Sequence, residues 1–439
     1  MKFRKYLLPT LLTIAVLLSL ALSVAMWLNP ARYGSRQQSN TKTPAKTESV
    51  NKSISYVYSP VQAVYADQNG NQELLVNTSV NSVAEIKRQM HDYKDASLKT
   101  ISTKSKDNYV EALERPNSFL LNYTSTVTMK LVDAFVNNRF KNLPNYEVDH
   151  IVVPTDDSNH LYLLADKEYK IYEITVQKHD LKGLQQIMQG DDIRQVPASV
   201  QMLNNKPNVY TENDFNLQTY RYLVSSQSED YYVSRLLNGE NSQNVRVKKQ
   251  GNNTNYTDGN NRQLTFNEKQ KMVDYNDFQA KPESLSLTSL LTGGYNNLVT
   301  LGVSLDNVRL YDHDANDHTM TYRYFVEGFP VFGNNGQGSI TMKNVNTETV
   351  RYRFPLTSPQ VPIPNGNDTV TMQSTQTVID RLKELGYKQS AIDQIHIGYR
   401  LQKDPSSTML VKLTPEWYIR YNGKWQSYSQ LSGTTITTN

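Results

Sequence analysis

The chain has 439 residues, no cysteine and a formal net charge of +4 at pH 7. That length suits roughly two to four domains with a full hydrophobic core, and the lack of cysteine excludes disulfides, thiolate metal sites, cysteine nucleophiles and a lipid anchor on cysteine. The charge excludes a basic nucleic-acid-binding surface on the main body of the chain, because residues 1–52 carry eight Lys or Arg against Glu48, a net of +7 that leaves −3 for the remainder.

An N-terminal transmembrane helix is predicted over residues 6–28. The uncharged apolar stretch Leu7–Leu28 has 22 residues, which as a helix span about 33 Å, enough for a bilayer core of about 30 Å. Three basic residues precede it, so the positive-inside rule places residues 1–5 in the cytoplasm. We therefore expect a single-pass protein of the cell membrane, with the C-terminal bulk outside the cytoplasm.

The same stretch has a second interpretation, as a cleaved signal peptide. Ser23-Val24-Ala25 resembles a small-residue cleavage site. The apolar region of a signal peptide is about 7–15 residues long, which is shorter than this one, so we favour the uncleaved anchor. Both interpretations place most of the chain outside the cell.

Three small residues of the predicted helix, Ala15, Ser19 and Ser23, recur every four positions and so share one face. A face of small residues lets a second transmembrane helix approach closely, and serine hydroxyls can hydrogen-bond across the contact. The sequence therefore gives a candidate helix-contact face. The alternative is that these residues face lipid, because Ala and Ser are common in such helices.

The rest of the chain divides into a flexible stalk and three domains. Residues 29–52 are rich in Ser, Thr, Gln, Asn, Lys and Pro, a composition typical of a stalk. We predict an N-terminal α/β domain over 53–205, a central domain over 206–298 and a C-terminal α+β domain over 299–433. The 29 tyrosines favour strands, so the predicted fold class is α+β, with a multi-domain, sheet-rich extracytoplasmic region after the transmembrane helix.

In the N-terminal domain, apolar spacing predicts helices over 82–94, 126–141 and 181–188. Apolar and alternating runs predict strands over the following ranges: 119–123, 148–153, 160–164 and 169–176. In the central domain, the predicted elements are strands over 217–224 and 245–248, a hairpin over 256–266 and a break at Gly293-Gly294.

The C-terminal domain has the clearest signals. Its predicted strands cover 320–329, 349–356, 409–413 and 417–421, and its prolines predict an irregular connection over 355–364. A helix over 378–385 ends at Gly386, and Asn422-Gly423 predicts a tight hairpin turn.

The chain lacks the common catalytic motifs, including His-Glu-x-x-His, Gly-x-Ser-x-Gly and the phosphate-binding Gly-x-x-x-x-Gly-Lys loop. The acidic segment 312–318 opens like a calcium loop, but its sixth position is Asp317 instead of glycine and its twelfth is Arg323 instead of glutamate. We interpret it as a solvent-exposed turn. The sequence thus predicts no catalytic residue, no metal site and no cofactor.

Several segments of the last 140 residues, taken in order, resemble the YycH family, also called WalH. The segments are 322–332 (Tyr-Arg-Tyr-Phe-Val-Glu-Gly-Phe-Pro-Val-Phe), 352–356 (Tyr-Arg-Phe-Pro-Leu), 362–364 (Pro-Ile-Pro), 397–399 (Ile-Gly-Tyr) and 415–419 (Pro-Glu-Trp-Tyr-Ile), followed by Trp425. Upstream, 256–262 is similar to the family's Tyr-x-Asp-Gly-x-Arg segment with one extra residue before the Arg. Trp27, Asn29-Pro30 and Tyr33 also fit the family's opening.

The resemblance implies a non-enzymatic, membrane-anchored regulator. YycH-like proteins act with a companion, YycI, on the sensor histidine kinase YycG (WalK), which controls cell-wall metabolism, through transmembrane helices and external domains. The resemblance also implies a YycI-like C-terminal domain. We interpret Phe329 and Pro330 as core and corner residues, not as partner contacts. The alternative function is an anchored cell-wall-binding module or cell-wall hydrolase, whose carboxylates can lie far apart in sequence.

Overall fold

The computed structural model describes residues 52–434 apart from 78–79, 95, 103, 138–139, 141–142, 191–192, 238–244, 260, 281–285, 347 and 364–367. None of the helices within these residues is both long and apolar enough to cross a membrane. The helix predicted over 6–28 and nearly all of the predicted stalk lie outside the described residues.

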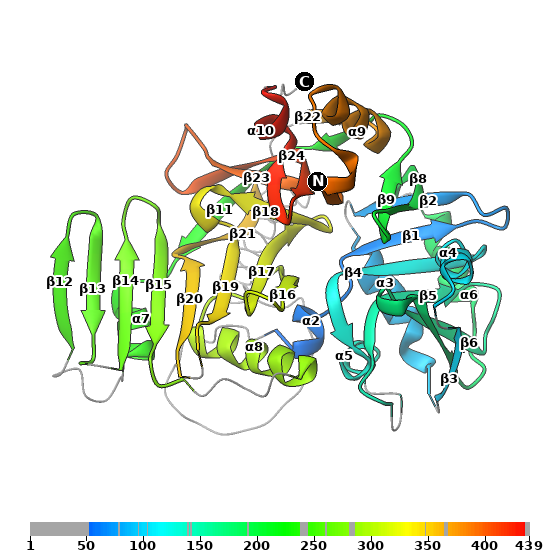
Figure 1. Cartoon of the computed structure of the whole chain (residues 1–439), viewed down its shortest axis with the longest axis horizontal. Helices are drawn as coiled ribbons and strands as arrows, with labels where there is room; N and C mark the ends of the chain where they lie inside the picture. The colour runs from blue at the N-terminus through cyan, green and yellow to red at the C-terminus, as the bar shows by residue number, and fades with distance from the viewer. Residues whose placement is uncertain are drawn as a thin grey trace, which may run out of the picture. The chain divides into compact units, whose positions relative to one another are not determined.

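The first sheet has nine antiparallel strands in the order β3-β7-β6-β5-β4-β1-β2-β8-β9 (Figure 1). The strands are β1 (Gln62–Ala66), β2 (Gln72–Asn77), β3 (Ser97–Ser102), β4 (Ser118–Thr128), β5 (Glu147–Pro154), β6 (His160–Ala165), β7 (Lys170–Thr175), β8 (Ile193–Leu203) and β9 (Lys206–Thr211). All four strands predicted in the N-terminal domain are confirmed, because each apolar run forms a central strand of this sheet.

The helices of this region follow their capping and apolar signals. They are α2 (Ile54–Val57), α3 (Ser82–Gln89), α4 (Lys106–Leu113), α5 (Met129–Phe135) and α6 (Lys182–Gln186). The Asn81 side chain accepts a hydrogen bond from Ala84 N and so caps α3. The helix predicted over 126–141 is shorter in the structure, because β4 continues to Thr128 before α5 begins.

The second sheet has fourteen strands, of which twelve follow the order β12-β13-β14-β15-β20-β19-β17-β18-β23-β24-β11-β21, while β16 pairs with β17 and β25 with β24. The strands are β11 (Tyr220–Ser226), β12 (Arg246–Gln250), β13 (Asn253–Thr257), β14 (Arg262–Asn267), β15 (Met272–Asp277), β16 (Val308–Asp314), β17 (Thr319–Val326), β18 (Phe329–Gly333), β19 (Ser339–Asn344), β20 (Val350–Pro355), β21 (Thr357–Ile363), β23 (Ile392–Lys403), β24 (Leu410–Tyr421) and β25 (Lys424–Ser427). Because β15 pairs with β20, strands of the predicted central and C-terminal domains share this sheet (Figure 1). The domain boundaries themselves stay predictions.

The remaining elements are β10 (Phe215–Gln218) paired with β22 (Thr369–Met372), and the helices α7 (Glu229–Leu236), α8 (Leu287–Leu301), α9 (Thr375–Glu384) and α10 (Tyr428–Ser432). The strand predicted over 217–224 is two strands, divided at Thr219. The strands predicted over 409–413 and 417–421 are instead one strand, β24.

The break predicted at Gly293-Gly294 is wrong, because both glycines lie buried inside α8. A Cβ atom at Gly294 would lie 2.3 Å from the Tyr322 hydroxyl and 3.0 Å from the Met320 methyl group. Gly294 is therefore needed for close packing of the helix against β17, and it does not act as a helix breaker.

The irregular connection predicted from prolines over 355–364 is also wrong, since residues 357–363 form β21. This strand ends the sheet order, and Pro359 and Pro362 lie in its pairing with β11, where the register shifts between Leu223 and Val224. Proline is tolerated on an edge strand because one side needs no backbone donor.

Side chains join the two sheets where β4 lies against β16 and β9 lies against β23. The Thr124 hydroxyl donates to Leu310 O at 2.7 Å, and Ile395 N donates to Asn208 Oδ1 at 3.1 Å. Helix α2 lies between the sheets and contacts both α5 and β16 (Figure 1). Its C-terminal neighbour Tyr58 shares a buried hydrogen bond with Tyr322, the two hydroxyls 2.7 Å apart.

Candidate functional site

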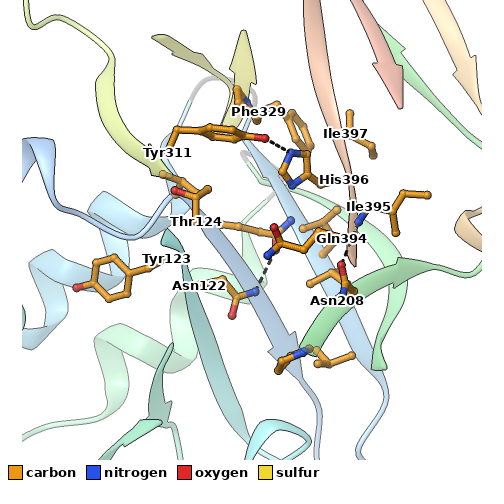
Figure 2. Close-up of a pocket in the computed structure, with 18 of the residues that line it drawn as sticks. Asn122, Tyr123, Thr124, Asn208, Tyr311, Phe329, Gln394, Ile395, His396 and Ile397 are labelled. Carbon is orange, nitrogen blue, oxygen red and sulfur yellow. Dashed lines mark hydrogen bonds between the residues drawn. The ribbon is translucent and has the colours of Figure 1, made fainter. Parts of the chain in front are cut away.

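The candidate site is a pocket of about 110 Å³ between the two sheets (Figure 2). Asn122, His150 and Asn208 line it from the nine-stranded sheet. The side formed by the fourteen-stranded sheet includes Tyr311, His396 and Trp425. The pocket thus has a polar side and an aromatic side, each built from one sheet.

The polar side continues into a buried network. Asn122 Nδ2 donates to Gln62 Oε1 at 3.0 Å, and Asn122 Oδ1 lies 2.8 Å from His150 Nδ1. His150 Nε2 lies 3.0 Å from Asp166 Oδ1, which also accepts a 2.7 Å hydrogen bond from the Tyr109 hydroxyl. A second carboxylate, Asp149, accepts from Thr126 Oγ1 at 2.6 Å and from Asp166 N at 2.8 Å. The network therefore joins three strands and α4 through side chains that are far apart in sequence.

The surroundings of His150 favour the imidazolium cation over the neutral ring, because both of its ring nitrogens face an acceptor oxygen. Burial alone lowers the pKa of His150, but the charge and hydrogen bond of Asp166 and the charge of Asp149 outweigh it, and the net shift is upward. Burial also raises the pKa of Asp166, yet the His150 charge and the hydrogen bonds from His150 and Tyr109 lower it overall. Burial and the nearby Asp166 charge raise the pKa of Asp149 to about 6. His150, which is 9% exposed, and Asp166, which is 29% exposed, therefore form a half-buried pair.

The aromatic side consists of stacked rings. Phe332 stacks on Tyr418 with centroids 3.6 Å apart, and His396 stacks on Trp425 at 4.2 Å. The Tyr311 hydroxyl lies 2.8 Å from His396 Nε2 and points to that ring (Figure 2). These side chains come from β16, β18, β23, β24 and β25; Tyr311, His396 and Trp425 line the pocket, and Phe332 and Tyr418 pack beside them.

This arrangement has no activated nucleophile. Burial, followed by the Arg323 charge, lowers the pKa of His396 to about 3, so His396 is a neutral ring that accepts from Tyr311. Burial raises the pKa of Tyr311 well above its usual range. A general base needs a pKa near the working pH, and the pair His396–Tyr311 lies far from it on both sides. We infer that these groups stabilise the pocket and do not transfer protons.

Arg323 supplies a buried cation beside the rings. Its guanidinium lies 4.1 Å from the Phe332 centroid and 4.7 Å from the Tyr311 centroid, and its Nη1 donates to Val331 O at 3.1 Å. The Trp425 indole nitrogen is buried without a hydrogen-bond partner in the part of the chain that the structure describes.

The acidic segment 312–318 forms the end of β16 and the turn to β17. Asp314 Oδ1 accepts from Asn316 N and Asp317 N, which is an ordinary turn interaction. Asp312 pairs with Arg420 at 3.7 Å, and Asp317 forms an ion pair with Lys343. The carboxylates have separate partners, and no group of three or more His, Asp or Glu residues in the described ranges could hold a metal ion.

The helix-contact face predicted at Ala15, Ser19 and Ser23 lies outside the described residues. Phe329 and Pro330 are both buried and line the pocket, as expected of core and corner residues. The sequence analysis missed the network around His150 and the stacked pair His396–Trp425. Scattered single histidines carry no spacing signal, and their partners lie on other strands.

Comparisons with known proteins cover nearly the whole chain. A family model described as YycH protein, N-terminal domain, matches residues 8–192, and one described as YycH protein, C-terminal domain, matches residues 206–432. Among solved structures, the chain is similar to the crystal structure of YycH from Bacillus subtilis, with a TM-score of 0.69 and 16% identity over 88% of this chain and 99% of that chain. At that identity the likeness shows the fold. No curated protein matches.

Proposed function

Since the chain belongs to the YycH family, we propose that it is a membrane-anchored, non-enzymatic regulator of the sensor histidine kinase YycG (WalK), acting together with YycI. Membership confirms the resemblance seen in the sequence and supports a regulator of the YycG/WalK two-component system in general. The family is known as regulatory and not as enzymatic. The match of both domain models is the observation that carries the proposal.

The anchor and the contact with YycI are the finer parts of the proposal. The apolar stretch Leu7–Leu28 with its basic flank supports a single-pass anchor that leaves the described residues outside the cytoplasm. The small residues Ala15, Ser19 and Ser23 support contact with helices of the kinase or of YycI. Such contacts shift the kinase between signalling states if they favour one state over another.

The pocket supports a binding role more than hydrolysis. The alternative hydrolase needs two carboxylates flanking a common cleft. Among the residues that line this pocket, the acidic one is Asp312, which pairs with Arg420. The carboxylates of Asp149 and Asp166 instead form hydrogen bonds with Thr126, His150 and Tyr109.

The double variant Ser19→Leu/Ser23→Leu is expected to reduce co-purification of YycG and YycI with the full chain by about tenfold. A lost hydrogen bond of a serine side chain between transmembrane helices costs about 1–2 kcal/mol, and 1.4 kcal/mol is a factor of ten in affinity. The matched control is Ala21→Leu, whose position falls on the opposite face of the predicted helix. Equal recovery of both partners with the double variant and the wild type would contradict a contact through this face.

A further inference from the structure

We propose that a second cavity, beside α3 and β16, binds a small anion that carries a phosphate group. This cavity of about 400 Å³ is distinct from the pocket around Trp425. Its walls come from both halves of the described chain: Lys87 on α3, Phe135 at the end of α5, Arg309 on β16, and Glu327 in the turn after β17. The proposal rests on these residues and not on the proposed function.

Arg309 is held in place at the cavity by neutral partners. Its Nε donates to Ser59 Oγ at 2.8 Å and its Nη1 donates to Val308 O at 3.0 Å. The guanidinium stacks on the Tyr56 ring, 3.5 Å from the centroid. Arg309 also interacts with the Tyr56 side chain through a hydrogen bond, and no carboxylate pairs with it within the described residues. The group is therefore oriented in advance at the cavity, with its positive charge not neutralised by an ion pair.

Lys87 supplies the second cation. Its amine lies 5.0 Å from the Phe135 centroid, and no hydrogen bond or ion pair involves it within the described part of the chain. Burial, followed by the charge of Arg309, lowers the pKa of Lys87. Two cations thus line one cavity and repel each other. An anion placed between them would replace that repulsion with two charge-assisted hydrogen bonds.

The acidic residues nearby do not neutralise this pair. Glu327 lines the cavity, but it forms no ion pair among the described residues, and burial raises its pKa to about 7. Asp306, next to the cavity residue Asn307, pairs with Lys52 at 3.0 Å. Glu85, on the same helix as Lys87, pairs with Arg88. The positive charge of Lys87 and Arg309 therefore remains open to a ligand.

The shape and lining indicate the class of ligand. An ammonium and a planar guanidinium suit a doubly charged phosphate, which arginine can bind through two parallel hydrogen bonds. The other walls are mainly apolar and include Pro60, Val61, Val83 and Phe325. A phosphate attached to a small apolar or glycerol-like body fits this combination. Because Lys87 lies on α3 beside the first sheet and Arg309 lies on β16 of the second sheet, a bound ligand would contact both sides of the interface between the sheets.

The test is calorimetric titration of the full chain, in neutral detergent at constant ionic strength, with inorganic phosphate, glycerol 1-phosphate and dihexanoyl phosphatidic acid. We expect binding that Lys87→Met weakens by about 10- to 100-fold, the loss of one charge-assisted hydrogen bond. Methionine keeps the aliphatic contact with Phe135, and Lys87→Gln is the second variant if Lys87→Met does not fold. Lys87→Arg should restore binding. The matched control Arg88→Met, one position along α3 and paired with Glu85, should leave it unchanged.

The three probes separate the sources of the phosphate. Tighter binding of the soluble lipid than of glycerol 1-phosphate identifies a lipid headgroup, and equal or weaker binding identifies a free phosphate compound. The proposal is overturned if none of the probes binds, or if Lys87→Met and Lys87→Gln bind as tightly as the wild type.

Discussion

Replacing His150 with alanine is expected to lower the free energy of unfolding by about 1.5–3 kcal/mol, the contribution of a hydrogen bond to a charged group, because the His150 side chain is 9% exposed and the Asp166 side chain 29%. The imidazolium lies 3.0 Å from Asp166, and Asp149 lies close enough to add its charge. Without His150, the Asp166 carboxylate keeps only the Tyr109 hydrogen bond on the oxygen they share. Urea unfolding followed by circular dichroism measures the change.

The matched control is His160→Ala. His160 also faces a carboxylate, with Nδ1 2.8 Å from Asp157, but both side chains are about 30% exposed. Exposed pairs contribute about 0–1 kcal/mol, so this variant should change the free energy of unfolding by less than 1 kcal/mol. The two pairs differ in the exposure of the histidine, 9% for His150 and 30% for His160, so equal effects of the two alanine substitutions would show that burial of His150 does not strengthen its pair.

The same pair predicts a pH dependence with a definite sign. Because the pKa of His150 is raised in the folded chain, its stabilisation is complete below the unfolded pKa of about 6.5 and declines as the pH rises through the raised value. The difference in free energy of unfolding between the wild type and His150→Ala should therefore become smaller from neutral to mildly alkaline pH. A constant difference between the two proteins from pH 6 to 9 would contradict the assignment of His150 as imidazolium.

Gly294→Ala is expected to destabilise the chain by about 2–4 kcal/mol, from overpacking and a disturbed buried hydrogen bond. Alanine favours a helix over glycine by about 1 kcal/mol, so helix propensity alone predicts the opposite sign. The added Cβ would lie 2.3 Å from the Tyr322 hydroxyl. That hydroxyl is bound to Tyr58, which also donates to Leu291 O on the same helix, so displacing it disturbs a buried hydrogen-bond chain.

The control for Gly294 is Gly190→Ala, since a Cβ there meets nothing within 4 Å. Thermal unfolding of both variants should show a clear decrease in melting temperature for Gly294→Ala and little change for Gly190→Ala. An unchanged or raised melting temperature for Gly294→Ala would mean that α8 does not pack against β17 as closely as the structure places it.

Local signals made most elements predictable from the sequence. Asn422 and Gly423 both have positive φ, 49° and 75°, as the predicted tight hairpin between β24 and β25 requires. Gly386, with φ 91°, follows α9 as predicted. The predictions failed where a residue is required by a contact that is distant in sequence. Gly294 and the prolines of β21 locally predict breaks, but the Tyr322 hydroxyl and the place of β21 at the edge of the sheet, which explain them, cannot be inferred from neighbouring residues.

The contacts of the candidate site and of the second cavity join residues that are far apart in the sequence. His396 meets Tyr311 from 85 positions away, and Arg309 meets Ser59 from 250 positions away. Spacing within one strand or helix cannot reveal such pairs. The family resemblance was visible because it rests on ordered local segments such as 322–332, and the two family models confirm it.

The most direct test of regulation by this chain is the autophosphorylation rate of purified YycG in proteoliposomes, with and without the full chain and YycI. If the chain contacts one signalling state of the kinase more strongly than another, adding the chain should change the autophosphorylation rate several-fold. Ser19→Leu/Ser23→Leu should then return the rate toward that of the kinase alone. A rate that stays the same with and without the chain, at concentrations where the proteins co-purify, would contradict the proposed function.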